Sequence, residues 1–222
     1  MFVLDSSASE GTLNFHKQLD FVSRVVNDFQ IGPQNVQIGV LTFADQPALQ
    51  FNLNQYTDKQ AVLNAIQRIP YASGVTYTDK ALTYVNQNMF TASNGARNDA
   101  KHYVIVLTDG ASTDSAATIK AATTLKQNVD VIAIGIGSNT NQNELNTIAS
   151  DAQHVFTVTD FDALRTLRTD IKAAACEGTA TFNTQNHSRK KHYLVYIVFT
   201  GSKTNKHDIM TSTNVVYNSN ST

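Results

Sequence analysis

The chain has 222 residues, a net charge of −1 and only 16% charged residues, while Asn, Thr, Gln and Ser are abundant. This length suits one α/β domain of ordinary size with a remainder, and the near-neutral charge gives no reason to expect nucleic acid or an anionic membrane as a partner. No apolar run approaches the roughly 20 residues that span a bilayer, so the sequence predicts no membrane-spanning helix.

Strand and helix patterns alternate over the first 175 residues. Apolar residues recur at helical spacing from Phe15 to Phe29, whereas segment 103–107 is apolar almost throughout, as in a strand buried on both faces. Thr57 and Gln60 have the spacing of a capping box, with Thr57 as the helix cap. In chain order we expect strands at 2–4, 36–43, 48–53, 103–107, 129–136 and 154–157, and helices at 15–29, 60–69, 81–89, 115–126, 143–149 and 161–171.

This alternation predicts the α/β class, with a doubly wound, mostly parallel six-stranded sheet and helices on both of its faces. Segment 48–53 alternates with period two after a Gln-Pro turn, and we expect it at an edge of the sheet. Residues 179–222 differ in character, because they are rich in polar residues and their one apolar run is 193–199. We expect them to form a polar, poorly ordered tail.

The two ends of the domain carry their own signals. Met1 is followed at once by Phe-Val-Leu-Asp, with no basic leader or cleavage site, so we expect an N-terminally truncated chain that begins inside its first strand. Cys176 is the only cysteine, which rules out an internal disulfide and a cysteine-based zinc site. We expect Cys176 to be a surface thiol that can form an intermolecular disulfide in an oxidising compartment.

Hard oxygen donors follow the first strand at alternate positions, in the order Asp5, Ser7 and Ser9. Such oxygens suit Mg²⁺, Mn²⁺ or Ca²⁺ rather than zinc or copper. The alternative is ordinary helix capping by the same residue types.

Two later segments add to this pattern. Thr76 lies in a loop rich in Gly, Ser and Thr, and Asp109 directly follows a buried-looking strand. Ligands of doubly wound sheets lie outside the carboxyl ends of the strands, where the strand order reverses. If the strands before Asp5 and Asp109 are neighbours there, their carboxylates meet in one crevice. Taken singly, Thr76 is equally well explained as a loop hydroxyl and Asp109 as part of a turn.

Together the three segments resemble the metal-ion-dependent adhesion site of von Willebrand factor A domains, the family of integrin I domains and of the matrilin and collagen VI modules. The resemblance implies the strand order 3-2-1-4-5-6 and a bound Mg²⁺ or Mn²⁺, with Ca²⁺ as a further candidate. The implied metal ligands are Asp5, Ser7, Ser9, Thr76 and Asp109. Two carboxylates and three hydroxyls leave a divalent cation roughly neutralised and able to accept an outside carboxylate.

The resemblance covers about residues 2–178, which we take as the domain, with 179–222 as the tail. Segments 38–43, 78–82, 134–137 and 176–178 resemble the family's later elements. Ala8 and Asp79 stand where the family usually has Gly. Ile134-Gly-Ile-Gly137 lacks the third glycine of a dinucleotide-binding loop, so we set that interpretation aside.

The resemblance implies a secreted, non-catalytic adhesion or matrix-assembly module that binds collagen or another acidic protein through a cation. One alternative is an intracellular domain of the same family within a protein complex. Another is a metal-dependent phosphatase or hydrolase with Asp5 as nucleophile, although Asp5-Ser6-Ser7 has no second carboxylate at D-x-D spacing and the three loops hold no His or Lys except Lys80.

Overall fold

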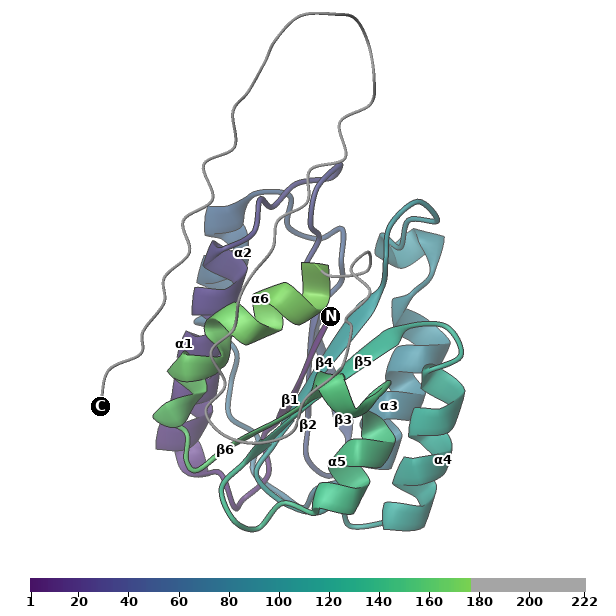
Figure 1. Ribbon diagram of the computed structural model, residues 1–222. Coiled ribbons are helices and arrows are strands. Elements are labelled where there is room, and N and C mark those ends of the chain that lie inside the picture. Colours follow the sequence, from purple (N-terminus) through teal and green to yellow (C-terminus); the bar gives the residue numbers. More distant parts are fainter. Residues whose placement is uncertain (177–222) are drawn as a thin grey trace, which may run out of the picture. The chain divides into compact units, whose positions relative to one another are not determined.

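A computed structural model describes residues 1–176. Its centre is one six-stranded sheet with the strand order β3-β2-β1-β4-β5-β6 (Figure 1). The strands are β1 (Phe2–Asp5), β2 (Val40–Phe43), β3 (Pro47–Phe51), β4 (Tyr103–Thr108), β5 (Asp130–Ile136) and β6 (Val155–Val158). All neighbours pair in parallel except β2 and β3. The predicted fold class, strand order and edge position of β3 are confirmed.

Helices cover both faces of this sheet (Figure 1). The α-helices are α1 (Gly11–Asn27), α2 (Lys59–Ile66), α3 (Thr78–Tyr84), α4 (Ser115–Leu125), α5 (Gln142–Ile148) and α6 (Arg168–Cys176). Apolar side chains of α1, α2 and α6 form one core cluster with the sheet, and those of α3, α4 and α5 form a second.

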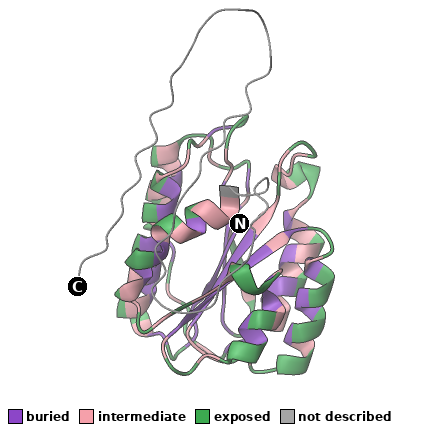
Figure 2. Cartoon of the chain, in the orientation of Figure 1, coloured by how far each residue is buried: buried purple, intermediate pink, exposed green. Residues whose placement is uncertain are grey.

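The central strands bury both of their faces, which explains why their sequences are apolar without alternation. Phe2 and Leu4 of β1 belong to the first cluster, whereas Val3 points to the second. Figure 2 shows that the buried sides of the helices face the sheet. Every apolar residue of β1 therefore packs in one of the two core clusters, and the first polar residue, Asp5, is the last residue of the strand.

Several predicted boundaries differ from the structure, among them those of β2 and α2. Strand β2 starts at Val40 rather than at residue 36, because its pairing with β1 begins only at that residue. The cap of α2 is Asp58 and not Thr57, since the Asp58 carboxylate accepts the backbone N–H of Ala61 at 2.9 Å. A π-helical turn, Val85–Met89, completes the predicted helix at 81–89.

The last helix is also later than predicted. A 3₁₀ helix, Ala163–Leu167, leads into α6, so Phe161 lies before the helical segment rather than in it. Within residues 1–176 no helix is both long enough and apolar enough to cross a membrane. The predicted tail at 179–222, the domain boundary at 178 and the side chain of Cys176 lie outside what the structure describes.

The amino ends of β1 and β4 lie at the end of the sheet opposite to the one where Asp5 lies. A surface cavity there is lined by Met1 and Phe2, by Tyr103 at the start of β4, and by Ala175 near the end of α6. The first strand thus enters, and the last helix ends, beside the same cavity.

Candidate metal centre

Asp5 ends β1, and none of its surface is exposed. One carboxylate oxygen, Oδ1, accepts the backbone N–H of Ser7 at 2.9 Å, and the other, Oδ2, accepts the hydroxyl of Thr108 at 2.6 Å. Burial raises the pKa of Asp5 to about 6, against the lowering effect of these hydrogen bonds. The carboxylate is thus held in a fixed orientation by the loop that follows β1 and by β4.

Hydroxyl groups connect this part of the site to Asp109, which directly follows β4. The hydroxyls of Ser7 and Ser9 lie 3.1 Å apart, and the Ser9 hydroxyl donates to Asp109 Oδ1 at 2.8 Å. Burial also raises the pKa of Asp109. The neighbouring positions of β1 and β4 in the sheet therefore bring together two carboxylates that are 104 residues apart (109 − 5) in the chain.

The loop that carries Thr76 is bonded to both of the other loops. The backbone N–H of Ala8 donates to Gly74 O, and that of Thr113 donates to Thr76 O, each at 2.8 Å. Thr76 itself is nearly buried, with 9% of its surface exposed. The structure therefore places the Thr76 loop between the Asp5 loop and the segment that follows Asp109.

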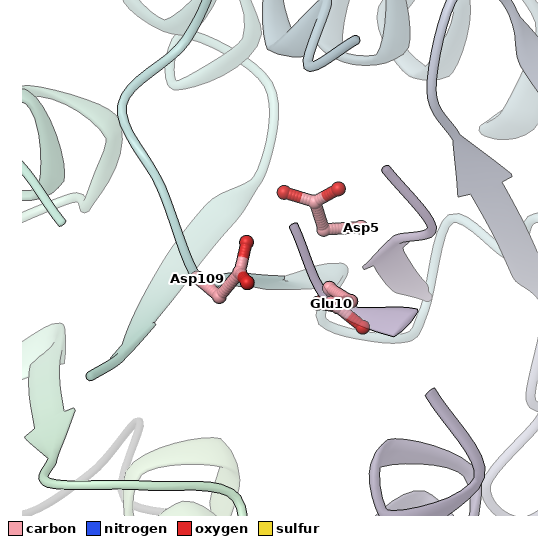
Figure 3. Close-up of side chains that lie close together, drawn as sticks. All are labelled: Asp5, Glu10 and Asp109. Atoms are coloured by element: carbon pink, nitrogen blue, oxygen red, sulfur yellow. The ribbon is translucent and has the colours of Figure 1, made fainter. Parts of the chain in front are cut away.

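Sequence analysis missed two residues of this cluster. Thr108 fixes the Asp5 carboxylate, and Glu10 places a third carboxylate beside Asp5 and Asp109. One oxygen of each of these acids lies within 4.8 Å of the others, and Figure 3 shows the three side chains close together. The available signals were the hydroxyl directly before Asp109 and the acid directly after Ser9.

No basic side chain accounts for this gathering of negative charge in residues 1–176. Burial, followed by repulsion from Asp5 and Asp109, raises the pKa of Glu10 to about 10. The ion pairs of Lys17, Arg24, Arg97 and Arg168 all use other carboxylates. Lys80, the one basic residue expected in the three loops, donates to Asp45 O and lies over the ring of Tyr77.

The side chains that meet here fit a divalent cation. They offer only carboxylate and hydroxyl oxygens, the donors that hard cations take. They come from separate loops that β1 and β4 hold in register, so that a cation would find them already assembled.

The family model described as von Willebrand factor type A domain matches residues 1–170. The chain belongs to this family. It is 36% identical over 177 residues to the human collagen alpha-5(VI) chain and 33% identical over 178 residues to the collagen alpha-1(XII) chain of Notophthalmus viridescens. Each match covers 79% of this chain but only 7% and 19% of those collagens, so the domain corresponds to a small part of each relative.

Among solved structures, the domain is similar to proximal thread matrix protein 1 from the mussel byssus, with a TM-score of 0.74 and 33% identity. The match covers 79% of this chain and 47% of the mussel protein, whose metal-ion-dependent adhesion site holds zinc in that structure. A related domain therefore binds a divalent metal at the corresponding motif. The ion there is not one of the hard cations that the oxygen donors led us to expect.

Gly74 offers a test of the Thr76 loop. Its φ of +129° is rarely adopted by other residues, and a Cβ atom would lie 2.9 Å from the carboxyl of Asp45, which accepts the backbone N–H of Val75. We expect Gly74→Ala to lower the free energy of unfolding by about 1–3 kcal/mol, measured by urea denaturation. Gly110→Ala is the matched control, because a Cβ there meets nothing within 4 Å. Equal stability of the two variants would contradict this account of the loop.

Proposed function

We propose that the domain is a non-catalytic adhesion or matrix-assembly module that binds a protein ligand through a divalent cation. The proposed metal ligands are Asp5, Ser7, Ser9, Thr76 and Asp109. The observation that carries the proposal is the meeting of Asp5, Asp109 and the serine hydroxyls at the carboxyl ends of β1 and β4. Mg²⁺ or Mn²⁺ is the proposed physiological ion, with Ca²⁺ as the alternative.

The site is arranged for recognition from outside. Asp5 and Ser7 are buried, whereas Ser9 is exposed and Asp109 is half-buried, so the cluster opens to solvent on one side. A cation held by this set would act as a Lewis acid toward an incoming oxygen. A carboxylate on a partner protein is the group whose charge and geometry suit that position.

Exposed apolar residues next to the metal loops support a protein partner. Leu13, in the first turn of α1, is 71% exposed, and Val75, directly before Thr76, is 48% exposed. Single exposed apolar side chains are common on proteins, but these two belong to segments that directly adjoin the proposed ligands. They would add apolar contact around a metal-bridged carboxylate.

The relatives support the proposed setting. Two of them are collagen chains, and a similar structure is a matrix protein of the mussel byssus. They support our proposal that this domain acts outside the cell, with collagen or another acidic matrix protein as its ligand.

A surface-binding assay tests the proposal directly. Fibrillar collagens and acidic matrix proteins are immobilised, and the wild-type chain is applied with Mg²⁺ or with EDTA. We expect binding only with the cation, and a loss of at least tenfold in Thr76→Ala, because even loss of a group that only orients a metal ligand costs about 10- to 100-fold in metal affinity. Thr123→Ala, at an exposed position on α4, is the matched control and should bind normally.

Two results would contradict the proposal. Binding that survives both EDTA and Thr76→Ala would place the interaction elsewhere on the domain. Phosphatase turnover that depends on Asp5 would favour the enzyme alternative.

A further inference from the structure

We propose that Glu10 is an additional ligand of the metal centre, and that Gln18 holds its carboxylate in position for the cation. This inference rests on the proposed metal site and adds to it a residue outside the set Asp5, Ser7, Ser9, Thr76 and Asp109.

The first observation is a buried oxygen without a partner. Glu10 is 2% exposed, and its Oε1 atom forms no hydrogen bond in the described structure. A buried carboxylate oxygen without a donor is costly, because it has lost water and gained nothing in return. A cation beside Asp5 and Asp109, whose carboxylates lie within 4.8 Å, would supply the missing partner.

The second observation concerns the direction of the side chain. Glu10 occupies the cap position of α1, where a short polar side chain ordinarily accepts a backbone N–H of the first turn. Glu10 makes no such bond. One of its carboxylate oxygens lies instead within 4.8 Å of oxygens of Asp5 and Asp109, so the side chain joins the acidic cluster and does not cap the first turn of the helix.

Gln18 explains how Glu10 stays there. Gln18 lies on α1 with none of its surface exposed, and its Nε2 atom donates to the backbone oxygen of Asp5 at 3.0 Å and to Glu10 Oε2. The same amide group thus joins the end of β1 to one oxygen of Glu10. The second oxygen, Oε1, is buried and has no hydrogen-bond partner among the described residues.

Charge gives the consequence for the cation. Asp5 and Asp109 alone would neutralise a divalent ion, whereas three carboxylates make the centre anionic overall. The added attraction strengthens cation binding from the protein side. Glu10 would also take a coordination position that a water molecule would otherwise fill, so the bound ion would carry fewer waters.

The test measures Mn²⁺ binding by the full chain. Electron paramagnetic resonance of free Mn²⁺ gives the dissociation constant, and water-proton relaxation gives the number of waters on the bound ion. We expect Glu10→Gln to bind Mn²⁺ about tenfold more weakly or worse, and to admit one more water. We expect Gln18→Leu to weaken binding by a smaller factor, because it only positions Glu10.

Three controls keep the outcomes apart. Glu144→Gln alters the other buried glutamate of the described residues, which bonds Ser112 instead, and should leave Mn²⁺ affinity within about twofold, a change well below that of a lost metal contact. In EDTA, Glu10→Gln should melt at or above the wild-type temperature, which shows that it folds. Asp5→Ala reports on the metal site itself.

These arms separate the two hypotheses. If Asp5→Ala loses Mn²⁺ while Glu10→Gln keeps wild-type affinity and hydration, Glu10 is not a ligand and the proposed function stands. If the wild-type chain binds no Mn²⁺, Mg²⁺ or Ca²⁺, the proposed function itself is wrong.

Discussion

Asp5→Ala should abolish the stabilisation that Mg²⁺ or Mn²⁺ gives to the wild-type domain. An ion that binds only the folded state adds about 2.7 kcal/mol at a hundredfold excess over its dissociation constant. Asp5 is the most deeply buried of the proposed ligands that carry charge, and both of its oxygens are oriented by hydrogen bonds. Its removal takes away the carboxylate around which the other donors are assembled. Thermal melting with the cation and with EDTA measures the difference.

Asp20→Ala is the control for this experiment. Asp20 lies on α1 and pairs with Arg24 on the surface, so its loss should leave the response to the cation unchanged. Equal metal responses in wild type and Asp5→Ala would remove Asp5 from the metal site.

Glu10→Gln should become increasingly more stable than wild type as the pH rises from 5 to 8 in EDTA. The pKa of Glu10 in the metal-free fold is about 10, against an ordinary 4.5. Over this range the folded protein keeps a proton that the unfolded chain has released, so the contribution of Glu10 to stability falls as the pH rises. At about 1.4 kcal/mol per pH unit, the difference between the variants should grow by roughly 4 kcal/mol.

Wild type and Glu10→Gln must be compared at each pH, because another group changes the stability of the fold with pH in the opposite direction. Burial lowers the pKa of the Met1 amino group from 8.0 to about 5, so its contribution makes the fold more stable as the pH rises over the same range. That contribution is common to both proteins and cancels in the difference. Urea denaturation at pH 5, 6, 7 and 8 provides the measurement. A constant difference across these values would show that Glu10 is ionised in the fold.

The sequence predicted where the acidic cluster lies, but it did not predict all of the residues that make up the cluster. Asp5 and Asp109 could be placed together because each follows an apolar strand, and parallel strands end at the same edge of a sheet. The family resemblance then supplied the strand order that makes β1 and β4 neighbours. That resemblance, rather than any local pattern, also linked Thr76 to the two carboxylates.

Glu10 and Thr108 were beyond this reasoning because side-chain direction decides their roles. Glu10 precedes a helix, where sequence alone favours an exposed acid, and only the amide of Gln18 and the start of α1 at Gly11 reveal that it turns inward. Helix limits failed for a similar reason. The apolar pattern marks the buried face at Phe161, but it does not say that the first helical turn forms later, at Ala163.

The placement of the two ends of β1, one beside the surface cavity and the other at the proposed metal centre, has a mechanical consequence. Met1 begins β1 beside the cavity, Ala175 of α6 lies there too, and Asp5 ends the same strand at the proposed metal centre. A pull between a partner held by the cation and the amino end of β1 would therefore run along β1. Both neighbours of β1 are parallel to it, and their hydrogen bonds lie across the direction of pull. Such a load shears many bonds at once instead of opening them singly, an arrangement suited to a protein under tension.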